Sequence, residues 1–71
     1  MLVEIEDFKT GWYGIMLGTK KSEIDQMIDA LNKIKTTEGH FHLRGDYKGS
    51  GGVGDIEIYL QNEEEENNMV I

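Results

Sequence analysis

The residues best suited to chemistry lie in one stretch, HFHLRGDYKGSGGVGDIEIYL, which begins at His40. His40 and His42 are two residues apart, and Asp55 and Glu57 have the same spacing. Side chains two apart on a β-strand point to the same side of the sheet. Two imidazoles in this arrangement can ligate Zn²⁺, Ni²⁺ or Cu²⁺, and a carboxylate on the neighbouring strand can complete the site.

The same residues have a structural interpretation that needs no metal. If Arg44 pairs with Asp55 across a hairpin, the alternation of the strands also places His42 opposite Glu57. Opposite charges that face each other across two strands stabilise a sheet by about 0.2–1 kcal/mol each. We therefore expect a structural role for these residues, with no metal and no cofactor assigned. A metal site and a catalytic histidine are the alternatives.

Four glycines, Gly49, Gly51, Gly52 and Gly54, lie between the histidines and the carboxylates. Glycine-rich loops bind phosphate when they lead from a strand into the N-terminus of a helix. This loop leads from one expected strand to another, and no Lys-Ser or Lys-Thr pair follows it. The sequence predicts a flexible hairpin loop. The alternative is a site at which backbone N–H groups and Lys48 bind a small anion or a peptide.

The spacing of apolar residues predicts the strands that position this stretch. Residues 2–8 and 12–18 alternate in side-chain character, which is typical of half-buried strands. The connection between them is short and contains a glycine, so the two strands are expected to form a hairpin. Two further strands are predicted at residues 40–47 and 55–61. In the first of these, Tyr47 is expected to point inward with the other apolar residues.

Between the two hairpins the apolar spacing changes to three and four, which is typical of an amphipathic helix. Ser22 is the expected N-cap, with Thr19 as the cap of an earlier start. One apolar face per element predicts an α+β fold of two layers, in which the order β-β-α-β-β packs one amphipathic helix on an antiparallel sheet. Residues 1–62 are expected to form a single domain. Residues 63–71 are expected to form an acidic C-terminal tail, with a short edge strand at its end as an alternative.

Charge is distributed unevenly along the 71 residues, whose formal net charge is −7. All seven Lys and Arg residues lie in residues 1–48, whereas residues 49–71 hold six acidic residues and no basic one. Direct DNA or RNA binding is disfavoured, because there is no basic stripe to contact phosphates. The distribution indicates instead an acidic end that attracts a basic partner.

Other function classes find little support in the sequence. There is no cysteine nucleophile, and the only serines, Ser22 and Ser50, have no base or orienting residue that the sequence reveals. No apolar run approaches the ~18 residues of a membrane span, and the N-terminal residues lack the features of a secretory signal. We expect a cytoplasmic protein that is not an enzyme. Because so short a chain has a small core, a homodimer or another partner is expected to add stability.

The segments GWYGIMLG and HFHL…DY…GG.GDIEIYL, with the helix between them, resemble small bacterial immunity-type proteins of the immunity protein 32 family. The resemblance covers most of the chain and rests on the general pattern, without an active-site motif. Such proteins, like the small acidic inhibitors that phages use against bacterial defence nucleases, bind and block a target. The resemblance implies no catalysis and one dedicated protein partner.

The resulting hypothesis is a non-catalytic inhibitor of immunity or anti-defence type. Its carboxylates would take the place of phosphates on a basic, nucleic-acid-binding surface of a protein such as a nuclease. The expected partner-contact residues are acidic and aromatic: Trp12, Tyr47, Asp55, Glu57, Tyr59, Glu63, Glu64, Glu65 and Glu66. The alternative is an oligomeric module that binds or sequesters a small ligand, either a nucleotide or a metal. Its site residues would be His40, His42, Arg44, Lys48 and the glycine loop. A third interpretation is a small structural or regulatory domain whose polar sheet face mediates self-association.

Overall fold

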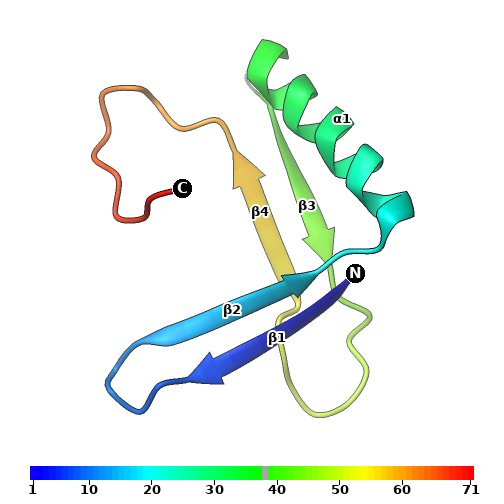
Figure 1. Cartoon of the computed structure of the whole chain (residues 1–71), viewed down its shortest axis with the longest axis vertical. Coiled ribbons are helices and arrows are strands. Elements are labelled where there is room, and N and C mark those ends of the chain that lie inside the picture. Colours follow the sequence, from blue (N-terminus) through cyan, green and yellow to red (C-terminus); the bar gives the residue numbers. More distant parts are fainter. Residues whose placement is uncertain (38) are drawn as a thin grey trace.

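The computed structural model describes residues 1–37 and 39–71 and contains one helix and four strands (Figure 1). In chain order the elements are β1 (Leu2–Asp7), β2 (Tyr13–Gly18), α1 (Lys21–Thr37), β3 (His40–Arg44) and β4 (Asp55–Tyr59). The predicted α+β class and the order β-β-α-β-β are confirmed. Across the described residues, no helix combines the length and the apolar character that a bilayer crossing requires.

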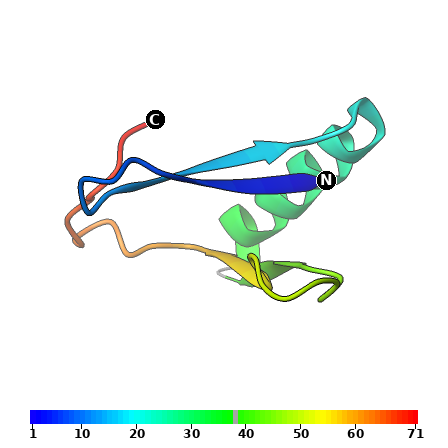
Figure 2. The same ribbon diagram turned by 90° about the horizontal axis from the view of Figure 1, so that it is seen from below.

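The four strands form two separate antiparallel sheets, β1–β2 and β3–β4, and not the single sheet expected from the sequence. Figure 2 shows the two hairpins as separate layers, and α1, which connects them in the chain, contacts β3. Within each hairpin the register keeps apolar residues opposite one another. The apolar pairs are Val3 with Leu17, Ile5 with Ile15, Phe41 with Ile58, and Leu43 with Ile56. Alternation along the chain specifies each hairpin, but it carries no signal for which hairpin edges should pair.

The start of α1 has a capping arrangement that differs from the prediction. The helix begins at Lys21, so Lys20 is the N-cap and Ser22 lies within the first turn. Glu23 Oε1 accepts a hydrogen bond from the Lys20 N–H at 2.9 Å, as the third helical residue does in a capping box. Glu23 Oε2 also accepts one from the amino group of Met1 at 2.7 Å. These two contacts, the amino group first, hold the pKa of Glu23 below its usual range.

The interior of the described chain is small. Among the described residues, Ile34 of α1 is the one hydrophobic residue that is buried, with 8% of its surface exposed. The apolar residues of β3 and β4 are half-buried, so the core lies where α1 meets β3. Apolar side chains on the first hairpin and on α1 are exposed to solvent. These are, among others, Ile5, Ile15, Leu17, Ile24, Ile28 and Leu31.

Candidate functional site

The β3–β4 hairpin brings the histidines and carboxylates together in the register that the sequence predicts. The opposed pairs are His40 with Tyr59, His42 with Glu57, and Arg44 with Asp55. Because side chains two apart share a face, these polar residues project from the side opposite to the apolar pairs of the same strands. The expectation that one hairpin face collects the polar side chains is therefore met.

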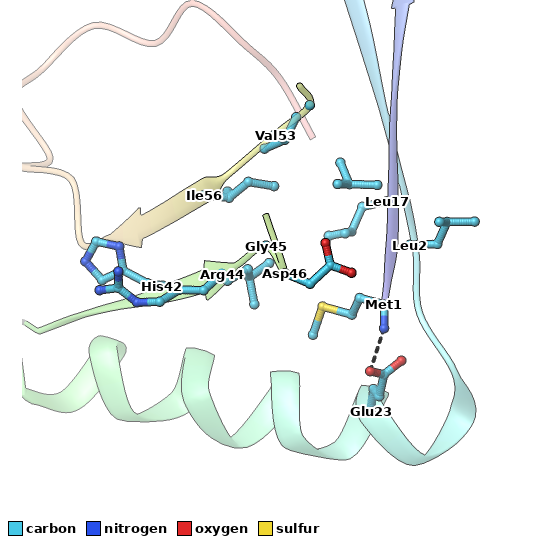
Figure 3. Close-up of a pocket in the computed structure, with 13 residues that line it drawn as sticks. Met1, Leu2, Leu17, Glu23, His42, Arg44, Gly45, Asp46, Val53 and Ile56 are labelled. Carbon is cyan, nitrogen blue, oxygen red and sulfur yellow. Dashed lines mark hydrogen bonds and ion pairs between the residues drawn. The ribbon is translucent and has the colours of Figure 1, made fainter. Parts of the chain in front are cut away.

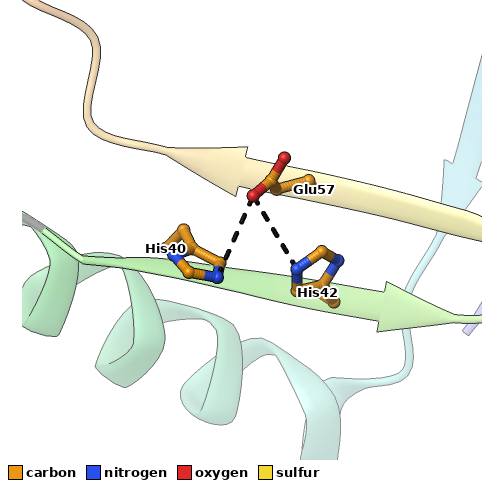
Figure 4. A group of neighbouring side chains, drawn as sticks. All are labelled: His40, His42 and Glu57. Atoms are coloured by element: carbon orange, nitrogen blue, oxygen red, sulfur yellow. Dashed lines mark ion pairs between the residues drawn. The ribbon is translucent and has the colours of Figure 1, made fainter.

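Three of these side chains converge on one small volume (Figure 4). His40 Nε2 lies 3.9 Å from Glu57 Oε1, and His42 Nε2 lies 3.7 Å from the same oxygen. The ligand atoms of the three residues all lie within 4.8 Å of one another. The two imidazole rings stand nearly perpendicular, with their centroids 5.2 Å apart. His42 is the least exposed of the three side chains, at 27%.

Asp55 binds the other nitrogen of His42. The Nδ1 atom lies 2.9 Å from Asp55 Oδ2 and 3.1 Å from Oδ1. A carboxylate only accepts hydrogen bonds, so this contact assigns the proton to Nδ1. The predicted partner of Asp55, Arg44, is more distant, with Nη1 at 3.9 Å from Oδ1. The diagonal contact between His42 and Asp55 was missed, because strand register indicates directly opposed pairs and gives no signal for diagonal ones.

The loop between β3 and β4 uses its polar groups within itself. β3 ends at Arg44, and Tyr47 lies beyond it with a positive φ of 57°. Its ring lies against Gly54, where an added Cβ would be 2.8 Å from Tyr47 Cε1. The expectation that Tyr47 points inward on a strand is therefore wrong. The Lys48 N–H donates to Asp46 Oδ1 at 2.9 Å, so this backbone group is engaged within the loop and is not free to bind an external anion.

A cavity of about 560 Å³ lies between the first hairpin and the β3–β4 hairpin (Figure 3). Its apolar lining includes Met1, Leu2, Val3, Leu17, Val53 and Ile56. Its polar lining includes Glu23, His42, Arg44 and Asp46. This cavity could not be predicted, because its walls come from two hairpins whose relative position no local sequence pattern encodes. His42 and Arg44 connect it to the polar face of β3.

The predicted aromatic contact residues are exposed but lie on separate segments. Trp12 is in the β1–β2 connection, Tyr47 is in the β3–β4 loop, and Tyr59 ends β4. Their exposed fractions are 76%, 75% and 59%. Figure 1 shows these three segments at different edges of the chain, so the structure does not gather the aromatic residues into one patch.

The acidic segment after β4 is a hydrogen-bonded turn. Asn62 Oδ1 accepts a hydrogen bond from the Glu64 N–H at 3.0 Å, and the Asn62 carbonyl accepts one from the Glu65 N–H at 3.0 Å. Glu65 Oε1 in turn accepts one from the Asn62 N–H at 3.2 Å. Residues 61–71 contain neither a helix nor a strand, so the alternative of a C-terminal edge strand is not realised. The carboxylates of residues 63–66 are all exposed.

No protein-family model matches this sequence, and comparisons with curated proteins and with solved structures also find no match. The resemblance to immunity-type proteins therefore stays a prediction from the residues that carry it. The geometry of the chain itself is the basis for the proposals that follow.

Proposed function

We propose that this protein is a non-catalytic inhibitor, of immunity or anti-defence type, that binds a basic surface of a protein target. The observation that carries the proposal is a set of exposed carboxylates on β4 and in the turn after it. Asp55 and Glu57 lie on the polar face of β4, and four glutamates follow at residues 63–66. No Lys or Arg occurs after residue 48, so this segment has no basic residue of its own to neutralise it.

The exposed aromatic residues supply contact area beside these charges. Tyr59 ends the strand that carries Asp55 and Glu57, and its ring is mostly exposed. Tyrosine and tryptophan are over-represented among the residues that dominate binding energy. Tyr59 is the best-placed of the predicted aromatic contacts, since Trp12 and Tyr47 lie on other segments.

The mechanism is electrostatic and steric. The acidic segment attracts a basic target surface and accelerates their encounter, and the folded chain then covers the surface on which the target would hold nucleic acid. An encounter steered by charge slows as salt rises, because the Debye length shortens to about 8 Å at physiological ionic strength. Neither catalysis nor a cofactor is needed for this action.

The test compares two double charge reversals of equal size. Glu63→Lys with Glu64→Lys alters the acidic turn, and Asp25→Lys with Asp29→Lys alters the exposed face of α1. Glu23 is unsuitable as a control because it caps the helix. The tagged protein is used to capture its target from host extract, and the association rate is measured at two salt concentrations. We expect the turn variant to bind at least tenfold more weakly and to lose most of its salt dependence. Equal weakening by both variants, with both folded, would contradict the proposal.

A second candidate function is an oligomeric module that binds a small ligand, a nucleotide or a metal. The specific observation in its favour is that His42 belongs both to the three-residue cluster with His40 and Glu57 and to the lining of the 560 Å³ cavity. Native mass spectrometry of protein purified without chelator separates the two candidates. An added nucleotide mass that is lost on denaturation favours the ligand module, and a chain that carries no such mass favours the inhibitor. A bound metal ion alone is compatible with both functions.

A further inference from the structure

We propose that His40, His42 and Glu57 form a binding site for a divalent transition-metal ion, with Zn²⁺ as its expected occupant. Asp55 is assigned the role of a positioning residue that orients His42. This site deepens the second candidate function, the ligand module, and it does not depend on the inhibitor function.

The position of the His42 ring proton is the first reason to expect a metal ion at this cluster. A neutral imidazole has one nitrogen that donates and one that accepts a hydrogen bond. Because His42 Nδ1 faces the carboxylate of Asp55 at 2.9 Å, its proton is on that side. In the neutral ring His42 Nε2 then carries the lone pair that a metal ion binds, and it lies 3.7 Å from Glu57 Oε1. An imidazole nitrogen and a carboxylate oxygen are both zinc ligands, so the two atoms can share one ion.

The distances between the ligand atoms are the second reason to expect a metal ion. Zinc binds imidazole nitrogen and carboxylate oxygen at about 2.0–2.2 Å, so tetrahedral ligands lie about 3.3–3.5 Å apart. The separations of the two Nε2 atoms from Glu57 Oε1 are 3.9 and 3.7 Å. A closure of about 0.5 Å or less brings each of these two separations to the zinc value, and all three ligand atoms already lie within 4.8 Å of one another. All three side chains are partly exposed and have the freedom to make this adjustment.

The position of Asp55 is the third reason. Histidines that bind metals nearly always donate their second N–H to a carboxylate, a carbonyl or water, and this contact fixes the ring and raises its basicity. Asp55 is on the adjacent strand, its carboxylate contacts Nδ1 with both oxygens, and Nε2 is left facing the cluster.

The donor set determines the kind of metal. Two imidazoles and one carboxylate suit zinc and its first-row neighbours, whereas Mg²⁺ and Ca²⁺ prefer oxygen ligands. Three protein ligands leave one position of a tetrahedral site for water or for a group from another molecule. The open position faces solvent, so exchange at this site is expected to be fast.

The experiment uses the full chain without a polyhistidine tag and titrates it with Zn²⁺ by calorimetry and with Co²⁺ by visible absorption. We expect one ion per chain. His40→Ala and Glu57→Gln should each weaken binding at least tenfold, and Asp55→Ala should weaken it about 10- to 100-fold. Asp29→Asn, which removes an exposed carboxylate from α1, should have no effect. Circular dichroism checks that each variant is folded.

The role of Asp55 has its own readout. Nitrogen-15 NMR of the imidazoles distinguishes the two tautomers of His42, and we expect the proton on Nδ1 in the wild type and a mixture of tautomers in Asp55→Ala. A wild type that binds no Zn²⁺ at millimolar concentration would overturn the proposal. Binding that survives both His40→Ala and Glu57→Gln would overturn it as well, since the ion would then be held elsewhere.

A different observation concerns the surface of the whole chain. Its accessible area is 6759 Å², whereas a compact monomer of 8.1 kDa is expected to expose about 4,500 Å². Its radius of gyration of 14.2 Å likewise exceeds the value of about 11 Å for a compact chain of this length. Part of the excess belongs to the extended C-terminal residues. The rest includes the apolar face of the first hairpin, on which Ile5 and Ile15 are 51% and 61% exposed.

We infer that a second copy of this chain covers this apolar face in the folded protein. With one buried hydrophobic residue among those described, the isolated chain has too little interior to be stable, because small domains already have marginal cores. The occupant must therefore be present when the chain folds. An inhibitor has to fold before it meets its target, and the partner that is available at that moment is another copy of itself.

Area and charge both permit this arrangement. A stable interface buries roughly 800 Å² on each partner, which the excess surface of the chain more than supplies. On the apolar face of the first hairpin, Val3 and Leu17 line the cavity between the hairpins, so Ile5 and Ile15 are the residues left for a second copy. Glu4 and Glu6 point to the other side of the hairpin. The acidic residues after residue 48 lie on other elements, so the second copy leaves them for the target.

Light scattering of the purified chain tests the inference, together with denaturation at several protein concentrations. We expect about twice the chain mass of 8.1 kDa and a midpoint that rises with concentration, since obligate dimers lose association and folding together. Ile15→Glu should abolish both the doubled mass and the concentration dependence of the midpoint. Met69→Glu, a change in the exposed C-terminal segment, should affect neither property. A folded wild-type monomer whose midpoint is independent of concentration would overturn the inference.

Discussion

The loop end of the β3–β4 hairpin has no room for a side chain at Gly45. A Cβ added there would lie 2.8 Å from the carbonyl oxygen of Val53 and 3.3 Å from two backbone atoms of Gly54. The Gly45 N–H also donates to the Gly54 carbonyl at 2.8 Å, so the strand cannot move away without losing this hydrogen bond. Because the atoms that the Cβ meets are backbone atoms, no side-chain rotation relieves the clash. We expect Gly45→Ala to open this end of the hairpin.

The loss of stability in Gly45→Ala is the sum of three free-energy contributions. Overpacking a filled site costs about 1–3 kcal/mol, and loss of the hydrogen bond adds about 0.5–1.5 kcal/mol. Alanine also restricts the unfolded chain, which returns about 0.4–1 kcal/mol. The free energy of unfolding should therefore fall by about 2 kcal/mol.

Chemical denaturation followed by circular dichroism, at one fixed protein concentration, measures this difference. Gly51→Ala is the matched control, because an added Cβ at Gly51 meets nothing within 4 Å and the residue has no positive φ. The control should be unchanged or slightly more stable. If Gly45→Ala is as stable as Gly51→Ala, the close approach of the two strands at this point is not present in solution.

Two further substitutions test the core and the helix start. Ile34→Ala should lower the free energy of unfolding by about 2–4 kcal/mol, because it leaves a cavity at the buried position of α1. Val70→Ala, at an exposed position, should change the free energy of unfolding by less than about 0.5 kcal/mol. Equal effects of the two substitutions would mean that Ile34 is not in the core. Glu23→Gln should lower the stability at pH 7 and make it fall less steeply below pH 5. The pKa of Glu23 is below its ordinary value of 4.5 in the folded chain, so its contribution is present above that value and is lost as the pH falls through the folded pKa. Identical pH profiles of the variant and the wild type would contradict this contact.

The hairpins and the helix could be predicted because their signals are local. Alternation in LVEIED and DIEIY specifies strands, and the spacing from Ile24 to Ile34 specifies an amphipathic helix. The first residue of the helix was predicted less accurately, because Lys20 is not a preferred N-cap residue. The start is marked instead by Glu23, which accepts hydrogen bonds from the Lys20 N–H and from the amino group of Met1. The second of these contacts joins residues 22 positions apart in the sequence, which meet at the open end of the first hairpin where Leu2 pairs with Gly18, and no local pattern indicates it.

The candidate site divides in the same way. The pairing of His42 with Glu57 was predictable from strand alternation once Arg44 was placed opposite Asp55. The contact of His42 with Asp55 was not, because it depends on rotamers that a sequence does not specify. The position of Tyr47 was also missed, since a positive φ at a non-glycine residue arises from the loop as a whole.

The separation of the strands into two pairs bears on how two copies would associate. A two-stranded sheet is marginal by itself, and each strand of such a pair is an edge with one row of unpaired backbone groups. All four strands are therefore edge strands, and the chain has no proline to block them. If edges of one copy pair with edges of the other, the wider sheet that alternation predicts for a single chain is completed between two chains. Amide hydrogen exchange tests this step: the outward N–H groups of β1 and β2, the hairpin that the second copy covers, should be protected as strongly as those within the hairpin. Exchange at the rate of the Gly49–Gly52 loop would mean that the copies associate through side chains alone.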